Sequence, residues 1–368
     1  MKRKFTPRDR ACTFAIAMAL LGSVLGAAFL SGQELCQFFS IHGPWLFAAV
    51  AVAMVLMFFI CTVILRLAVD TGEGRMDKIV VFFDCKPVRA AVAIFEILFV
   101  FMLYLVGVAA FGSLFEQMLS VPAVIGSAIF AIAIFLLSLL GIKGLLRFFA
   151  MVIPVLVLLA LFIGIFALVR TGNVSFPKGE AQGMVSGIWP IDGVSYAAFT
   201  LFCMLPVFVP FGASMHGQGK SVWRGVLIGI LLFASLTIVI LLAIATDPAV
   251  REFSMPMIEL ATRQSPIFGV IYGILLICGI FSATLSAAAA MSEYFGRTFS
   301  KKKSFLVPVM AVTSFAAFVL GLIGFRELVS VLFPIFGYVG IIPIILLLIH
   351  AWRFYRGRRA KEKQDTQQ

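Results

Sequence analysis

Long uninterrupted runs of apolar residues constrain the fold of this chain more than any other feature. Many of these runs extend over about twenty residues or more, which at about 1.5 Å of rise per residue is enough for an α-helix to cross a hydrocarbon layer roughly 30 Å thick. Only 12% of the 368 residues are charged, against roughly 25% in an average soluble domain. We therefore predict an all-α membrane protein whose helices form a single transmembrane domain.

Charged, glycine-rich or proline-rich breaks divide the apolar runs into ten predicted spans. We place these spans at residues 11–40, 44–66, 88–119, 121–140, 145–169, 190–218, 221–245, 265–296, 304–323 and 328–352. The joins near Leu119 and Gly324 are the least marked, because few polar residues separate the neighbouring spans there. The spans form two halves of five, residues 11–169 and 190–352, followed by a basic tail at 353–368. Because each half has an odd number of spans, the two halves run in opposite directions.

The distribution of positive charge predicts the orientation of the chain. If the N-terminus is cytoplasmic, the inner segments contain 24 of the 29 Lys and Arg residues, and such residues accumulate in cytoplasmic loops. We therefore expect both termini to be cytoplasmic. The apolar run that follows Lys2, Arg3 and Lys4 also has features of a secretory signal as far as Ala27, but it continues beyond the usual h-region, and we expect it to be retained.

Several other classes of function lack the residues that they need. The net charge of +12 comes from short clusters at the ends of apolar runs, which indicates membrane anchoring rather than a nucleic-acid partner. The six cysteines have no paired or metal-binding spacing, and His42, His216 and His350 lie at span edges without a metal-compatible partner. The sequence Gly141-Ile142-Lys143-Gly144 is a short basic turn and not a phosphate loop. We expect neither an enzyme nor a cofactor.

The first predicted span contains residues that interrupt a helix near mid-membrane. Gly22, Ser23, Gly26, Ser31 and Gly32 fall within eleven residues. Each glycine lowers helix propensity by about 1 kcal/mol relative to alanine, and serine bonds to freed backbone groups. This pattern predicts a discontinuous helix. A second interpretation is close helix packing through the small residues Gly22 and Gly26.

The sixth predicted span contains a second interruption at Leu205-Pro206-Val207-Phe208-Val209-Pro210. Its prolines remove backbone donors and clash with the preceding turn. Paired interruptions in the first span of each oppositely oriented half point to the binding site of an inverted-repeat transporter, because unwound backbone in a membrane persists only where it lines a cavity or binds a ligand. The predicted substrate site consists of Gly22, Ser23, Gly26, Ala27, Ala28, Ser31, Gly32, Leu205, Pro206 and Pro210. Freed amides favour a carboxylate and freed carbonyls favour a cation, so we expect a small amino-acid-like solute.

The stretch Gly26-Ala27-Ala28-Phe29-Leu30-Ser31-Gly32-Gln33-Glu34, followed by Phe38-Phe39, resembles the first-helix signature of YkvI-type bacterial membrane proteins. These proteins form a branch of the amino acid–polyamine–organocation superfamily. Ala28 and Leu30 depart from the signature, in which glycine and alanine are usual. The resemblance implies a LeuT-like fold of ten helices in a 5+5 inverted repeat, with helices 1 and 6 interrupted, in the bacterial cytoplasmic membrane. A more distant resemblance links the chain to branched-chain amino-acid carriers and to the permease-like subunits of spore germinant receptors.

The resemblance to LeuT-like carriers also implies an ion site and a substrate contact. The ion would lie between carbonyls near Ser23 and Leu25 and the hydroxyls of Ser282 and Ser286 on the eighth span. The alternative is that these hydroxyls bond to their own helix or to a neighbouring helix. Tyr104 on the third span stands where related carriers bind the substrate carboxylate, although a packed tyrosine is the commoner arrangement. The fifth span lacks the lysine of some proton-coupled relatives, which favours sodium over a proton.

Charged residues inside spans are rare and are functional candidates by default. Glu34 follows the first break and is expected to act in coupling or gating, unless it lies at a water-exposed outer mouth. Glu96 is the second coupling or gating candidate, near the cytoplasmic side of the third span, where pairing or snorkelling would also explain it. The acids at span ends are explained by solvation: Glu116, Asp192, Glu293 and Glu327.

The expected function is secondary active transport by alternating access, coupled to sodium or a proton, with the lipid bilayer and a small solute as the partners. The rival hypothesis is a ligand-sensing permease-like receptor subunit that binds a solute without moving it. A scaffold without a ligand is the third hypothesis. The segment Asp247 to Gln264 between the seventh and eighth spans has the apolar spacing of a short interfacial helix over an outer vestibule.

Overall fold

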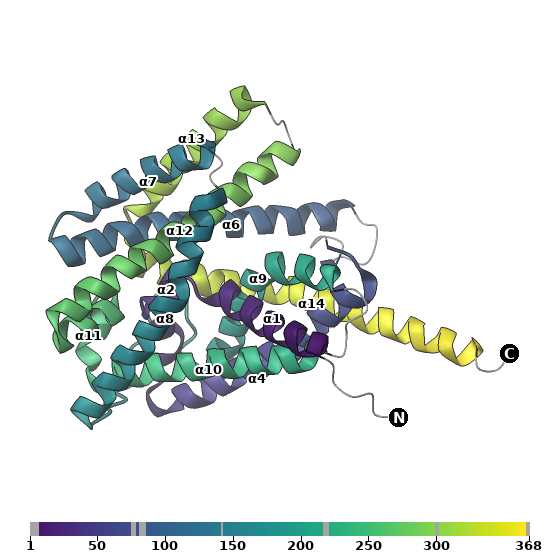
Figure 1. Ribbon diagram of the computed structural model, residues 1–368, viewed down its shortest axis with the longest axis horizontal. Helices are drawn as coiled ribbons and strands as arrows, with labels where there is room; N and C mark the ends of the chain where they lie inside the picture. Colours follow the sequence, from purple (N-terminus) through teal and green to yellow (C-terminus); the bar gives the residue numbers. More distant parts are fainter. Residues whose placement is uncertain are drawn as a thin grey trace.

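The computed structural model describes residues 7–74, 79–80, 86–140, 143–215, 221–298 and 302–365. In these residues the chain is almost entirely helical (Figure 1). The long helices are α1 (Pro7–Val24), α4 (Leu46–Thr71), α6 (Lys86–Leu119), α7 (Ala123–Leu140), α8 (Lys143–Thr171), α9 (Trp189–Ser214), α10 (Val222–Thr246), α12 (Pro266–Thr298), α13 (Lys303–Gly321) and α14 (Phe325–Asp365). The short elements are α2 (Ala27–Leu30), α3 (Gln33–Leu35), the π-helix η1 (Cys36–Ser40), the 3-10 helices η2 (Gly43–Trp45) and η4 (Pro248–Glu252), and α11 (Pro256–Gln264). The predicted all-helical fold is confirmed.

The helices follow the predicted spans in order. Eight helices in the described part of the chain are long and apolar enough to cross a membrane, and residues 11–24 and 123–139 form two shorter apolar helices. The first of these is short because α1 ends inside the first predicted span. The expected interfacial helix is present as α11, after the 3-10 turn η4. His216 and the residues 141–142 of the predicted basic turn lie outside the described residues.

The first predicted span consists of four consecutive pieces, α1, α2, α3 and η1. Helix α1 ends at Val24, and Gly26 has an extended backbone with φ −89° and ψ 175°. The Gly26 amide donates to the Val24 carbonyl at 2.8 Å, so the Gly22 carbonyl does not receive this helical bond. The chain resumes its helical course when the Leu30 amide donates to the Gly26 carbonyl at 3.0 Å.

The predicted interruption of the sixth span is wrong for this conformation. Helix α9 runs continuously from Trp189 to Ser214 with Pro206 and Pro210 inside it. Both prolines lie on the exposed face of the helix, whereas Leu205 and Phe208 are buried. Membrane helices tolerate proline where packing holds the remaining turns, and α9 packs along α4 on one side and α14 on another. The two missing donors therefore do not open the helix.

The bundle has two ends that face opposite directions along its long axis. Helix α1 begins and α14 ends at one end, on the right of Figure 1, and α11 lies at the other end, on the left. We call these the termini end and the α11 end. At the α11 end, the connecting segment 172–188 bonds to three parts of the bundle: Gly179 N to Ile41 O at 3.0 Å, Ser175 N to Ala245 O at 2.9 Å, and Met184 N to Ser330 O at 3.0 Å.

The basic tail does not form a separate segment, because α14 continues as a helix to Asp365. Arg, Lys, Ala and Glu dominate this stretch, and all four have a high helix propensity. The tail therefore extends the last helix beyond the bundle at the termini end (Figure 1).

Candidate functional site

The break between α1 and α2 is closed towards the α11 end. The Ser31 carbonyl accepts a hydrogen bond from the Met257 amide at the start of α11, at 2.9 Å. The Leu30 carbonyl accepts one from the Tyr272 hydroxyl of α12, at 2.5 Å. Every residue from 28 to 40 is buried. Carbonyls that α1 and α2 leave free on this side therefore bond to α11 and α12 and not to water.

Glycine is required at position 32 in this closure. Gly32 has a φ of +83°, and a Cβ added there would lie 3.0 Å from Ile244 Cδ1 and 3.1 Å from Met257 Cγ. The left-handed backbone turns the chain between α2 and α3, and the missing side chain lets α10 and α11 approach it.

Open space borders the other side of the break. Gly22 is exposed and Gly26 half-buried, and a Cβ added at either position would meet no atom within 4 Å. The interpretation that these two glycines serve close helix packing is therefore wrong. Close packing of α1 instead uses glycines of α10, where a Cβ at Gly225 would lie 2.6 Å from Ile16 Cβ and one at Gly229 would lie 3.1 Å from Leu20 Cβ.

Three of the predicted substrate residues do not reach the break. Tyr104 is fully buried, and its hydroxyl shares a 2.7 Å hydrogen bond with Ser314 of α13. Pro206 and Pro210 lie on the exposed face of α9. Helix α13 packs mainly on α6 and α7, so the Tyr104 hydroxyl is engaged between α6 and α13. The break itself places together the other predicted residues of the first span: Gly22, Ser23, Gly26, Ala27, Ala28, Ser31 and Gly32.

The predicted ion ligands are mostly bonded to their own helices. The Ser23 hydroxyl donates to Leu20 O at 2.8 Å, and the Ser286 hydroxyl donates to Ser282 O at 2.7 Å. The Ser282 hydroxyl differs, because the buried Ser282 side chain makes no hydrogen bond among the described residues. Helix α12 reaches the first span through Tyr272 and Leu30, ten residues before Ser282. Ser282 is therefore the one predicted ion ligand whose hydroxyl is available.

Glu34 does not lie at a water-exposed mouth. Its side chain is 6% exposed and lies against the Tyr196 hydroxyl of α9. The Phe38 and Phe39 rings pack on the Tyr196 ring, with centroids 5.2 and 4.7 Å away. Within the part of the chain that the structure describes, no Lys, Arg or His lies within ion-pair distance of Glu34. An unpaired carboxylate in such a core favours a proton or a cationic ligand. Glu96, the other candidate, is half-buried on α6.

A buried contact between a histidine and an aspartate, which the sequence does not reveal, joins the first half to α9. His42 Nε2 lies 3.1 Å from Asp192 Oδ2, and both side chains are almost fully buried. Asp192 also accepts hydrogen bonds from the Ser186 and Gly187 amides at 2.8 and 3.0 Å and from the Ser186 hydroxyl. Solvation at a span end therefore does not explain Asp192. The sequence signal for this contact was an acid in the first turn of a helix. The partner of that acid lies 150 residues earlier.

Comparisons with known proteins show similarity to two proteins of one bacterium. No family model matches the chain. The uncharacterized membrane protein YkvI of Bacillus subtilis is 22% identical over 339 residues, which cover 90% of this chain and 94% of YkvI. The uncharacterized protein YyaD of the same organism is 22% identical over 343 residues, covering 90% of this chain and 95% of YyaD.

Solved structures with the same fold are transporters. A manganese transporter variant of Eremococcus coleocola aligns with a TM-score of 0.56 at 12% identity, covering 95% of this chain and 87% of that chain. MhsT in complex with L-phenylalanine aligns with a TM-score of 0.54 at 16% identity, covering 92% and 87%. Mhp1 in its inward-facing conformation aligns with a TM-score of 0.54 at 15% identity, covering 92% and 73%. The chain is thus a membrane protein with the LeuT-like fold, and its resemblance to YkvI is confirmed.

Proposed function

We propose that this chain is a secondary active transporter that moves a small, amino-acid-like solute by alternating access. The observation that supports this most is the break at Leu25 and Gly26, which is closed towards the α11 end and borders open space on its other side. A pathway that is sealed on one side of a central break and open on the other is what alternating access requires. Two of the solved neighbours are named for manganese and for a complex with L-phenylalanine, and these names do not agree on one solute class. The proposed class of solute therefore rests on the freed backbone groups of this chain.

The pairing of helices supports two inverted repeats, residues 11–169 and 190–352. A two-fold axis in the membrane plane would exchange α1 with α9 and α4 with α10. It would turn the contact of α1 with α10 into the contact of α9 with α4, and both pairs pack closely. The same operation maps the contact of α6 with α12 onto itself, and that pair is among the most extensive in the bundle.

The described conformation corresponds to an inward-open state if both termini are cytoplasmic, as the positive charges indicate. The α11 end would then face outward, with α11 as the closed outer gate. Gln117 of α6 holds this gate at Met255, with one hydrogen bond in each direction at 3.1 and 3.2 Å. Arg170 of α8 holds the far end of α11 at Gln264 O, at 3.0 Å.

Sodium is the proposed coupling ion, bound between the first break and α12. The free Ser282 hydroxyl is the first ligand, and the hydroxyls of Ser23 and Ser286 reach the ion by turning away from their own helices. Leu25 contributes its carbonyl. Glu34 is the residue through which a proton would couple instead, because its carboxylate is buried without a cationic partner.

Uptake into proteoliposomes tests the function. We expect accumulation of at least one proteinogenic amino acid when a sodium gradient is imposed, and none without a gradient. Absence of gradient-driven accumulation across the whole panel, under sodium and proton gradients alike, would contradict transport. Binding without flux would identify the ligand-sensing receptor subunit in its place.

Two variants separate the coupling ions. Ser282→Ala should lower uptake at limiting sodium by roughly tenfold, the loss expected for one ligand to a charged group. Ser235→Ala is the matched control, because it removes an exposed α10 hydroxyl bonded to its own helix at Leu231 O. If Ser282→Ala keeps the sodium dependence of the parent while Glu34→Gln abolishes uptake, the coupling ion is a proton.

A further inference from the structure

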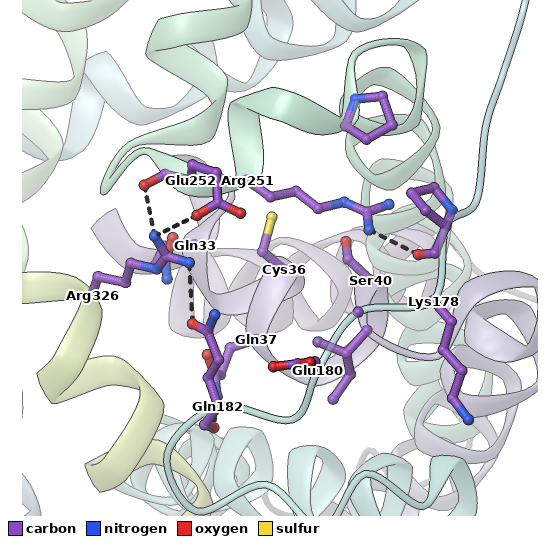
Figure 2. A pocket seen from close by; sticks show the side chains of 14 residues that line it. Gln33, Cys36, Gln37, Ser40, Lys178, Glu180, Gln182, Arg251, Glu252 and Arg326 are labelled. Atoms are coloured by element: carbon purple, nitrogen blue, oxygen red, sulfur yellow. Dashed lines mark hydrogen bonds and ion pairs between the residues drawn. The ribbon is translucent and has the colours of Figure 1, made fainter.

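A polar chamber of about 240 Å³ lies at the α11 end, beside the first span (Figure 2). Its walls come from α3 and η1, the connecting segment 172–188, η4 and the start of α14. Exposed side chains at its rim, among them Glu180 and Gln182, connect the chamber to the surface. The buried residues 28–40 and the bonds at Leu30 and Ser31 separate it from the break at Gly26. The chamber is therefore a second compartment and not part of the central site.

The chamber holds a guanidinium without an acid partner. Arg251 donates from Nη1 to Pro177 O at 3.1 Å, but its buried Nε has no hydrogen-bond partner. Among the described residues no carboxylate lies within ion-pair distance of Arg251. Burial lowers the pKa of Arg251 from its ordinary value, as expected for a charge that has lost water without gaining a counter-ion.

The second arginine of the chamber is already engaged. Arg326 donates to Glu252 O at 2.6 Å and to Gln182 Oε1 at 3.1 Å, and it lies 3.5 Å from Glu252 Oε2 (Figure 2). Arg326 therefore ties α14 to η4 and the segment 172–188. Arg251 differs from Arg326 because its Nε is a buried donor without a hydrogen-bond partner.

Acceptors without partners line the same chamber. The Gln33 Oε1 atom is buried and has no hydrogen-bond partner, in a side chain that is only 2% exposed. A buried amide oxygen without a hydrogen-bond partner is destabilising. Glu180 lines the chamber as well, and no cationic side chain of the described residues pairs with it. The chamber thus contains two cationic groups without an acid partner among the described residues, the buried Arg251 and the exposed Lys178, together with the Glu180 carboxylate and the free Gln33 acceptor.

We propose that the chamber is a binding site for a small zwitterion with the chemistry of an α-amino acid. Arg251 Nε binds the carboxylate, and Gln33 Oε1 and Glu180 accept hydrogen bonds from the ammonium group. Occupancy satisfies the two buried atoms that the empty chamber leaves without partners. The inference goes beyond the proposed function, because it requires binding at the α11 end and no movement of the solute.

Calorimetric titration of the full chain in lipid nanodiscs tests the proposal, with the twenty proteinogenic amino acids as probes. For an amino acid that binds, the carboxylic acid without its amine and the amine without its carboxylate are the matched probes. For L-alanine these are propionate and ethylamine. We expect the amino acid to bind at least roughly tenfold more tightly than either, because each lacks one charged hydrogen-bonding group. Equal affinity of the carboxylic acid and the amino acid would overturn the proposal in favour of a plain anion site, and no binding across the panel would overturn it outright.

Variants assign the binding to the chamber. Arg251→Gln and Glu180→Gln should each weaken one binding component by roughly tenfold or more. Arg356→Gln is the control, since it removes an exposed arginine of α14 that does not line the chamber. Unchanged affinity in both Arg251→Gln and Glu180→Gln, with elution in size-exclusion chromatography like the parent, would overturn the proposal. Binding that depends on Arg251 in a chain without uptake would leave the inference standing and remove the proposed function.

Discussion

At the turn between α2 and α3, Gly32 holds a left-handed backbone against Ile244 and Met257. We expect Gly32→Ala to lower the free energy of unfolding by at least about 1–2 kcal/mol, because a Cβ in this conformation is strained before any contact is counted. The closure at the α11 end should loosen as well, since the new methyl group would stand 3.0 Å from Ile244 Cδ1. Denaturant titration in detergent micelles measures the loss. Gly357→Ala is the control, at a helical glycine with no atom near the added Cβ, and it should be neutral or stabilising.

The His42 and Asp192 pair carries a second prediction. Asp192→Ala leaves His42 and the Ser186 and Gly187 amides without their acceptor, and breaking a buried pair costs roughly 3–5 kcal/mol. Asp192→Asn keeps an acceptor for the amides, so it should lose less. The same denaturant titration compares the two variants. Arg263→Gln, which breaks an exposed pair with Asp247, should change stability by about 1 kcal/mol or less. Equal losses of unfolding free energy in all three variants would show that the buried pair contributes no more to stability than the exposed pair.

Residue-level predictions from the sequence were right where local chemistry decides and wrong where a distant partner decides. Glycines at 26 and 32 indicated a local break, and the backbone there is non-helical. Asp192 was misjudged, and the bond of Tyr104 to Ser314 was not foreseen, because the partners His42 and Ser314 lie 150 and 210 residues away. No spacing within one helix reports such contacts.

Among the elements, substitutions in α9 test whether its two prolines contribute to the substrate site or only lie on the surface of the helix. Because both prolines face away from the packed side of a continuous helix, Pro206→Ala and Pro210→Ala should leave stability unchanged or raise it and should preserve uptake. Leu205→Ala, at a buried position of the same turn, should cost about 2–5 kcal/mol. Denaturant titration and proteoliposome uptake together separate the cases. Loss of uptake in both proline variants at normal stability would mean that α9 opens during transport.

Helix boundaries followed from the apolar runs because a helix in lipid must satisfy its own backbone. The continuity of α9 did not follow from the sequence, because its prolines predicted an opening. A proline removes one bond of one turn, whereas α9 packs along α4 and α14 over its whole length. In α1, by contrast, residues around Gly22 and Gly26 have open space beside them. Packing therefore decides which of two similar interruptions opens.

For the whole molecule, we expect the closure at the α11 end to set the balance between the two open states of the proposed transport cycle. Gln117→Leu removes both hydrogen bonds to Met255, and each is worth about 0.5–1.5 kcal/mol. We expect hydrogen exchange in residues 256–264 to accelerate by roughly tenfold. Arg170→Gln, which loses an exposed bond at Gln264, should accelerate exchange less. Equal exchange in Gln117→Leu and the parent would contradict the role of α11 as a gate.

The all-helical architecture and the order of the helices were predictable because they are properties of a linear pattern. The chamber was not predictable, since its groups come from Gln33, Glu180, Arg251 and Arg326 on four separate segments. Only the folded arrangement brings those segments to one end of the bundle.

Among the described residues, the break occurs in the first half of the chain only, and this asymmetry bears on the proposed alternating access. Helix α9 is continuous and packs against α4 and α14, so we expect it to stay in place. Leu30 and Ser31, at the end of α2, bond to α12 and α11, so we expect α1 to move instead, with Leu25 and Gly26 as its hinge. We therefore expect the movement of α1 alone to open and close the pathway at the termini end, whereas α11 closes it at the opposite end.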